Sequence, residues 1–195
     1  IKGVKWIEYG IKVAVTRING DCEVWCVNDS RDGLEQHLGS SMSSGVNGII
    51  GTASCSGNAL DATASILYNQ AGAVHLWKHF PSSSSSQPSS KKKKGVVSDF
   101  TVDGPLHCCS ASKTQAIFGG RENDVKLWDL ATQTCTFKAK NVPDDEVRLR
   151  VPVWVTDVTF IKPDIDGNSD LIVTGTGYKD VRMYDMRTGR QPVKN

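Results

Sequence analysis

Two kinds of side chain in this sequence could bind metal ions or form disulfides: six cysteines and four histidines. The cysteines are Cys22, Cys26, Cys55, Cys108, Cys109 and Cys135. None of them form a C-x-x-C pair, and no pair of histidines completes a zinc-type ligand set. Cys22 and Cys26 fall in one expected strand, about 13 Å apart by the usual rise, which is too far for a disulfide. We therefore expect reduced thiols, no metal site and no cofactor.

Motifs for nucleophilic catalysis or phosphate binding are missing from the sequence. There is no Gly-x-Ser-x-Gly and no Gly-rich loop that ends in Lys-Ser or Lys-Thr. The glycines at 119–120 and at 175 and 177 precede expected strands rather than helices, so they offer no helix N-terminus to a phosphate. His75 and His79 share a strand face but have no third ligand. We predict that the chain is not an enzyme and has no catalytic residues.

The remaining candidate chemistry is binding by basic and aromatic side chains. Arginine beside exposed aromatic residues is typical of interface hot spots, and it also suits phosphate contact and base stacking. The candidate partner-binding residues are Arg121, Glu122, Lys140, Asn141, Arg148, Arg150, Trp154 and Tyr178. Two of them have a structural alternative. Glu122 would pair with a neighbouring arginine or cap its turn, and Trp154 would belong either to the core or to the surface.

A repeat of about fifty residues supplies the elements that must position these side chains. Aromatic anchors recur at Trp25, Trp77, Trp128 and Tyr184, at spacings of 52, 51 and 56 residues (77 − 25, 128 − 77, 184 − 128). Each anchor follows a turn, and each turn follows a short apolar run, which is the pattern of strands joined by tight turns. Trp128 and Tyr184 are expected to pack between repeats. Asp129 and Asp185 are expected to accept hydrogen bonds from turn amides rather than bind ligands.

Each repeat parses as four strands. The third has expected strands at 106–110, 114–119, 125–130 and 134–139; the fourth has them at 154–161, 170–176 and 181–186, where the chain then ends before a fourth strand. Such units are typical of propeller blades. We predict an all-β fold: a WD-repeat β-propeller segment of about four consecutive blades from a seven-bladed ring. The approximate blades are 1–45, 46–104, 105–142 and 143–195. An unrelated β-sandwich is the alternative.

The blade topology also predicts where the loops meet. In a four-stranded meander, the loop before the first strand and the loop between the second and third strands lie at the same end. The segments 119–124, 140–154 and 177–180 should therefore share one rim of adjacent blades, with Arg121, Lys140, Arg148, Arg150 and Lys179 beside Trp154 and Tyr178.

Residues 81–95 interrupt the second repeat with serines followed by four lysines. Such a segment buries no apolar surface and is predicted to be disordered. A solvated spacer, a nuclear-import signal and an RNA contact are the open interpretations of its lysines. The net charge of the chain is only +2, and no apolar run is long enough to span a membrane, so we expect no membrane partner. The first residues, without Met or a leader pattern, favour an internal piece of a longer propeller.

The second half of the chain resembles the nucleolar WD-repeat ribosome-biogenesis family. The resemblance rests on an ordered series of short motifs: Gly119 to Asn123, Lys126 to Asp129, Ala139 to Val142, Leu149 to Trp154, Thr176 to Tyr178 and Val181 to Asp185. It implies a non-catalytic interaction scaffold in the nucleus and nucleolus that takes part in large-subunit precursor assembly and rRNA processing.

The resemblance also implies the partners. These are the pre-ribosomal large-subunit particle, its assembly factors and an AAA-type ATPase, with rRNA contact as a further possibility. The alternatives are a WD-repeat adaptor or substrate receptor outside ribosome assembly, or an RNA-binding propeller.

Overall fold

The computed structural model describes residues 3–8, 12–16, 21–27, 34–43, 48–55, 63–79, 96–161 and 169–194, with side chains for 48–53, 64–77, 98–161 and 169–194. The 81–95 insert lies outside these residues. The chain divides into two compact units: residues 1–69 with 73–100, and residues 70–72 with 101–195. The second unit carries all the candidate binding residues.

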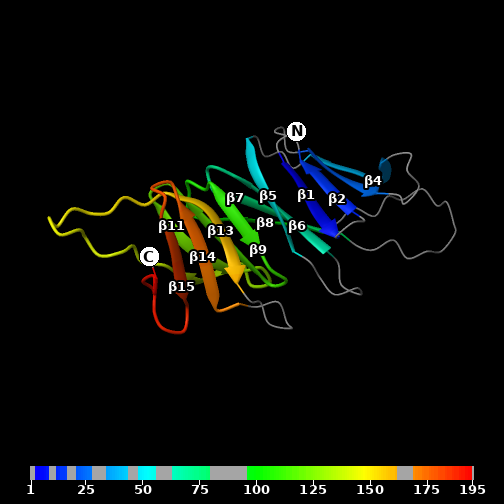
Figure 1. Cartoon of the computed structure of the whole chain (residues 1–195). Coiled ribbons are helices and arrows are strands. Elements are labelled where there is room, and N and C mark those ends of the chain that lie inside the picture. The colour runs from blue at the N-terminus through cyan, green and yellow to red at the C-terminus, as the bar shows by residue number, and fades with distance from the viewer. Residues whose placement is uncertain are drawn as a thin grey trace. The chain divides into compact units, whose positions relative to one another are not determined.

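All described elements are strands, arranged in antiparallel sheets whose order follows the chain (Figure 1). The first unit contains β1 (Gly3–Glu8), β2 (Lys12–Thr16), β3 (Asp21–Val27) and β4 (Leu34–Ser43), then β5 (Ile49–Cys55), β6 (Thr63–Asn69), β7 (Ala73–His79) and β8 (Val96–Thr101). The second unit contains β9 (Cys108–Ala111), β10 (Gln115–Gly120), β11 (Asn123–Asp129) and β12 (Thr134–Lys138), then β13 (Val155–Ile161), β14 (Leu171–Thr176) and β15 (Val181–Asp185).

The predicted all-β class and the predicted strands of the third and fourth repeats are confirmed. Two strands begin two residues from their expected start. β9 begins later, at Cys108, because residues 102–107 are taken up by the connection from β8, and β11 begins earlier, at Asn123. The described residues contain no helix. The blade boundaries and the closed seven-bladed ring stay predictions.

The β10–β11 hairpin shows why the local sequence folds as it does. Ala116, Ile117 and Phe118 are fully buried, as expected for an apolar run at the centre of a sheet. The register runs from Gln115 opposite Asp129 to Gly120 opposite Asn123, with an irregularity after Phe118. Residues 121 and 122 form the turn, in which Glu122 adopts a left-handed conformation with φ of 52°.

One isolated bridge, between Met183 and Lys194, lies beside β15. The Val193 amide donates to the Met183 carbonyl at 2.8 Å, and the Met183 amide donates to the Lys194 carbonyl at 3.0 Å. Residues 193–194 are therefore hydrogen-bonded to β15 at the edge of this sheet.

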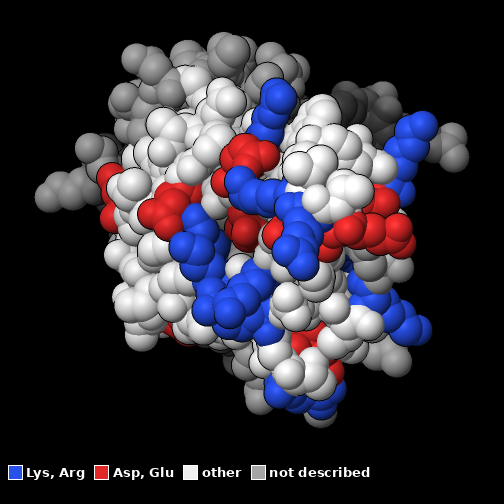
Figure 2. Space-filling view, turned by 90° about the vertical axis from the view of Figure 1, so that its left-hand side faces the viewer, with Lys and Arg blue, Asp and Glu red and all other residues white. Residues whose placement is uncertain are grey.

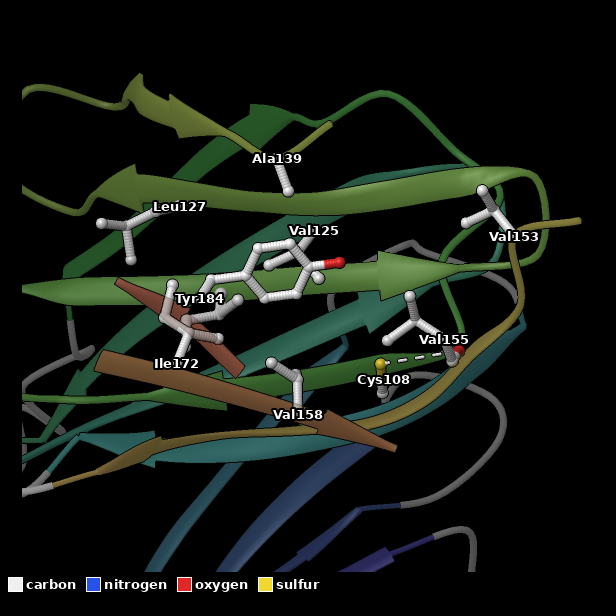
Figure 3. Close-up of a cluster of buried hydrophobic side chains, with 10 residues drawn as sticks. Cys108, Val125, Leu127, Ala139, Val153, Val155, Val158, Ile172 and Tyr184 are labelled. Carbon is white, nitrogen blue, oxygen red and sulfur yellow. Dashed lines mark hydrogen bonds between the residues drawn. The ribbon is translucent and has the colours of Figure 1, made fainter. Parts of the chain in front are cut away.

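An apolar core fills the space between the β9–β12 sheet and the β13–β15 sheet (Figure 3). Its buried residues are Cys108, Ile117, Val125, Leu127, Ala139, Val153, Val155, Val158, Ile172 and Tyr184. Tyr184 is only 2% exposed, so its predicted role in packing between repeats is confirmed. Burying one such side chain stabilises the fold by about 1.5–3 kcal/mol. Burial also raises the pKa of the Cys108 thiol to about 12.

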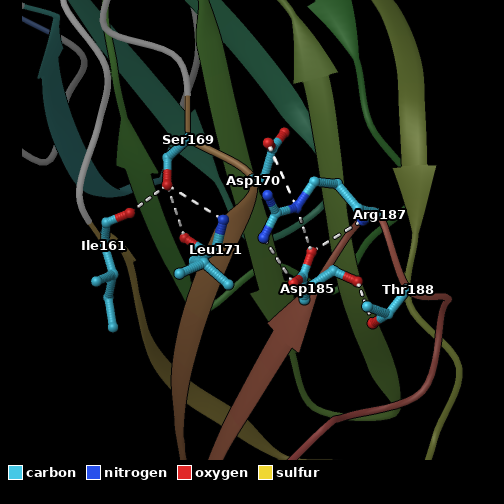
Figure 4. Close-up of polar contacts among 7 residues, drawn as sticks. All are labelled: Ile161, Ser169, Asp170, Leu171, Asp185, Arg187 and Thr188. Atoms are coloured by element: carbon cyan, nitrogen blue, oxygen red, sulfur yellow. Dashed lines mark hydrogen bonds and ion pairs between the residues drawn. The ribbon is translucent and has the colours of Figure 1, made fainter.

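Asp129 and Asp185 close their turns as predicted. The Asp129 carboxylate accepts hydrogen bonds from the Thr132 amide at 2.7 Å and the Ala131 amide at 2.9 Å, and these bonds lower its pKa. Asp185 accepts from the Arg187 amide at 3.0 Å and is bound by the Arg187 guanidinium, which holds the pKa of that carboxyl low (Figure 4). Both carboxylates are therefore engaged within their own turns.

Candidate interaction surface

Three loops of the second unit meet at one end of its two sheets, as the topology predicts. They are the β10–β11 turn, the long connection 140–154 and the β14–β15 turn. The Glu122 amide donates to the Val153 carbonyl at 2.8 Å, and the Gly177 amide donates to the Trp154 carbonyl at 2.8 Å. The connection is thus hydrogen-bonded to both turns, and we call the three loops together the rim.

The centre of the rim is a cluster of one arginine and two aromatic rings. The Arg121 guanidinium lies 5.6 Å from the centroid of the Trp154 ring. The Tyr178 ring meets the Trp154 ring edge-on, with centroids 6.0 Å apart and an interplanar angle of 80°. Cation–π and edge-to-face contacts of this kind each contribute about 0.5–1 kcal/mol at exposed sites. Trp154 is half-buried, while Arg121 and Tyr178 are exposed and available to a partner.

A glycine keeps the Trp154 ring in this position. A Cβ atom at Gly177 would lie 2.3 Å from Trp154 Cε3 and 2.4 Å from Cδ2, far inside contact distance. At Gly175, two residues earlier, a Cβ atom would meet its nearest neighbour, Thr156 Oγ1, at 3.7 Å. The rim therefore requires a glycine at 177 for a steric reason that does not apply at 175.

Glu122 and Arg150 form an ion pair beside this cluster, with Arg150 Nη1 3.0 Å from Glu122 Oε2. The structural alternative for Glu122, pairing with a neighbouring arginine, is thus observed. Both side chains remain more than half exposed, so the pair adds little to stability. Arg150 still presents positive charge to solvent at the rim.

Asn141 is engaged within the chain rather than displayed. Its amide nitrogen donates to the Val151 carbonyl at 2.5 Å, and its amide oxygen accepts from the Val142 amide at 2.9 Å and from Arg182 Nη1 at 3.1 Å. Asn141 therefore ties the two ends of the connection together and fixes them to β15. The neighbouring Lys140 has an exposed side chain, and its backbone amide donates to the Arg190 carbonyl at 2.8 Å.

Arg148 lies away from the Arg121 cluster, in the turn formed by residues 145–149. Its amide donates to the Asp145 carbonyl at 2.9 Å, and its φ of 60° is left-handed. This turn is in the part of the connection that projects from the sheets, drawn in yellow in Figure 1. Of the eight predicted residues, the structure brings together five: Arg121, Glu122, Arg150, Trp154 and Tyr178. The other three, Lys140, Asn141 and Arg148, lie on the same connection, and Asn141 is hydrogen-bonded to Val151 and Arg182.

A set of buried basic residues lies two positions before the aromatic anchors, and none of them was among the predicted site residues. Lys126 is 5% exposed, and its Nζ donates to Asn123 Oδ1 at 2.7 Å and to Asp103 Oδ2 at 3.0 Å. Arg182 is 3% exposed, and His75 is 6% exposed and contacts Asp99 at 2.6 Å. The signal was available in the repeat pattern, because His75, Lys126 and Arg182 each precede their anchor by two residues.

Two carboxyl groups near Lys126 and Arg182 have shifted pKa values. The hydrogen bond from Lys126 holds the pKa of Asp103 below its usual value. Burial raises the pKa of Asp124, and the neighbouring Arg150 and Arg182 oppose that shift. Leaving a buried charge without a partner costs considerable free energy. The pairing of these buried cations therefore holds the neighbouring turns in place.

Lys and Arg side chains gather over the middle of the face from which the long connection projects, with Asp and Glu beside them (Figure 2). Within the described residues, no three His, Cys, Asp or Glu side chains are grouped so as to hold a metal ion. The same part of the chain has no helix that is long and apolar enough to cross a membrane. The rim is therefore a surface of mixed charge with an aromatic centre.

The fold defines an all-β protein built from successive antiparallel sheets, with a cluster of basic and aromatic side chains on its loops. No family model matches the chain. Its curated homologues are named WD repeat-containing protein 74 and Ribosome biogenesis protein NSA1, and the resemblance found in the sequence is thereby confirmed.

Human (Homo sapiens) WD repeat-containing protein 74 is 44% identical over 77 residues, which cover 38% of this chain and 19% of that protein. The mouse (Mus musculus) protein of the same name is 34% identical over 124 residues, covering 63% and 30%. Ribosome biogenesis protein NSA1 of Meyerozyma guilliermondii is 32% identical over 114 residues, covering 52% and 28%. The chain thus spans less than a third of the length of these relatives. Their names indicate no catalytic activity.

A solved structure supports the fold. The computationally designed Ika8 protein matches with a TM-score of 0.59 at 14% identity, over 98% of this chain and 47% of that one.

Proposed function

We propose that this protein is a non-catalytic scaffold in ribosome biogenesis, acting in large-subunit precursor assembly and rRNA processing. Relatives at 32% and 30% identity are named ribosome biogenesis proteins, which supports this role. The proposal places the protein in the nucleus and nucleolus, docked on the pre-ribosomal large-subunit particle and its assembly factors. An AAA-type ATPase is proposed as a further partner on the family resemblance alone.

The observation that carries the docking proposal is the Arg121–Trp154–Tyr178 cluster with Arg150 at its side. An exposed guanidinium held against an aromatic ring offers a rigid, amphipathic contact that loses little conformational entropy on binding. The supporting contacts come from two sheets, so the surface exists only when those sheets are packed together. We propose that this rim, including Lys140 and Arg148 on the connection, is where the protein meets its particle.

The sheets themselves are proposed to be consecutive blades of a seven-bladed ring. Each antiparallel sheet with its aromatic anchor would be one blade, approximately 1–45, 46–104, 105–142 and 143–195. The packing of β13 against β9 and β10 across a shared apolar core supports this arrangement for the last two. Repeat architectures bury their blade faces against neighbours in just this manner.

Charge reversal tests the docking surface. In the full-length protein, Arg148→Glu combined with Arg150→Glu should abolish co-sedimentation with large-subunit precursors on sucrose gradients, because two cations become anions and Glu122 loses its partner. Lys113→Glu is the matched control, since Lys113 lies in the β9–β10 loop at the opposite end of the sheet. A folded double variant that still co-sediments would exclude this rim as the docking surface.

RNA contact is the second candidate, favoured by the guanidinium stacked on Trp154 and by the exposed Arg150. Nuclease treatment of the isolated particle separates the two candidates. Loss of the protein from the particle after nuclease supports RNA contact, whereas retention supports contact with another protein. Retention on a protein outside ribosomal precursors would favour the adaptor or substrate-receptor alternative.

A further inference from the structure

The tip of the long connection displays aliphatic side chains that serve no packing purpose in the described part of the chain. Val147 is 71% exposed and Leu149 is 64% exposed. Single exposed aliphatic residues are ordinary on protein surfaces. Two of them at the end of a projecting turn form a small apolar tip, which we define as residues 144–149.

One aspartate fixes the shape of this tip. Asp145 Oδ1 accepts hydrogen bonds from the amides of Val147 at 3.0 Å and Leu149 at 2.8 Å, the same two residues whose side chains are exposed. The Asp145 backbone adds two more bonds: its amide donates to the Leu149 carbonyl at 3.0 Å, and its carbonyl accepts from the Arg148 amide at 2.9 Å. The turn is therefore preorganised, which lowers the entropy lost when it docks.

The chemistry of the tip points to a protein partner. Asp144, Asp145 and Glu146 are exposed beside the two aliphatic residues and outnumber Arg148, the one basic residue of the tip, so the tip would repel the phosphates of RNA. The tip has no aromatic ring on which a base could stack. Aliphatic side chains gain free energy mainly by leaving water, so they require an apolar groove, and flanking carboxylates favour basic side chains at its edges.

We propose that residues 144–149 form a docking prong that inserts Val147 and Leu149 into an apolar, basic-edged groove of a partner protein. The prong belongs to the connection of the rim, but its residues are separate from the Arg121–Trp154–Tyr178 cluster. This proposal does not depend on whether the partner protein belongs to a pre-ribosomal particle.

The prong is tested by photocrosslinking in cells. A benzophenone amino acid replaces Glu146 in the full-length protein, which leaves Val147, Leu149 and the Asp145 bonds in place. The expected product is a covalent adduct with a protein that resists nuclease and is destroyed by protease. Leu149→Ser should lower the adduct yield about tenfold, because the variant loses the free energy gained when the Leu149 side chain is buried in the partner's groove. The same probe at Ala131, in the exposed turn after β11, should give no such adduct.

A second pair of variants tests how the tip is presented. Asp145→Ala removes the acceptor for both amides and should also lower the yield, whereas Asp145→Asn keeps an oxygen in that position and should retain most of it. An RNA adduct, no adduct, or a protein adduct unaffected by Leu149→Ser would overturn the proposal. Separating the adduct on a sucrose gradient tests the ribosomal role independently. If the Leu149-dependent adduct is found only outside the fractions that contain large-subunit precursors, the proposed ribosomal role is contradicted, while the proposed docking prong is still supported.

Discussion

Gly177→Ala tests the rim most directly, because a single added methyl group acts on the ring at its centre. The new Cβ atom would lie 2.3 Å from Trp154 Cε3, and ordinary contact begins at 3.4 Å, so the ring must move by about 1 Å. That movement carries Trp154 away from Arg121 and Tyr178. Gly175→Ala is the matched control, since its methyl group would meet only Thr156 Oγ1 at 3.7 Å.

The expected magnitude follows from three contributions. Overpacking of this kind costs about 1–3 kcal/mol. Loss of the Arg121 cation–π contact adds about 0.5–1 kcal/mol. Replacing glycine by alanine stabilises the protein by about 0.4–1 kcal/mol, because it reduces the conformational entropy of the unfolded chain. Gly177→Ala should therefore lower the free energy of unfolding by about 1–3 kcal/mol, while Gly175→Ala should be neutral or slightly stabilising.

The assay is urea unfolding of the full-length protein with both variants, followed by fluorescence and circular dichroism. Co-sedimentation with large-subunit precursors is measured in parallel, and only Gly177→Ala should reduce it. If Gly177→Ala unfolds at the same or a higher urea concentration than Gly175→Ala, then Trp154 does not pack against residue 177. The steric requirement for glycine at the centre of the rim would then be refuted.

Three further outcomes are expected. Tyr184→Ala should lower the free energy of unfolding by about 3–5 kcal/mol in the same urea assay, because it empties the centre of the core; a loss below about 1 kcal/mol would contradict that burial. Asp129→Ala should cost about 1 kcal/mol at neutral pH. Because the folded-state pKa of Asp129 is lowered, its contribution is complete above the ordinary value of 3.8 and lost as the pH falls below it. Unfolding at about pH 7 and about pH 2.5 should therefore show the variant and the wild type converging in acid, and an unchanged gap would refute the turn role. Iodoacetamide at about pH 8 should alkylate the exposed Cys135 well before the buried Cys108 in the folded protein, and mass spectrometry showing equal rates would contradict the burial of Cys108.

The strands and their turns could be predicted from the sequence because the forces that specify them act over short distances. The apolar run at 116–118 and the turn that follows it lie within one hairpin. Asp129 binds amides only two and three residues away, and Asp185 binds one two residues away. The crowding of three loops at one end also followed from the order of antiparallel strands, without any knowledge of side-chain positions.

Only the tertiary structure decided which residues contact one another at that end of the sheets. Arg121 and Trp154 are 33 residues apart in the chain (154 − 121), and Asn141 and Arg182 are 41 apart. Whether such residues meet depends on the register of each hairpin and on how one sheet packs against the next. A shift of one residue in register would turn every side chain of a strand to the opposite face.

For this reason the hydrogen bonds by which the Asn141 amide joins the connection to β15 could not be predicted from the sequence. The buried Lys126 and Arg182 were likewise missed, because a charged residue in a strand is ordinarily assigned to the solvent face. Local composition and spacing determined which elements form and where their loops emerge. Only long-range packing decided which side chains of these loops are buried in contacts within the chain and which are exposed.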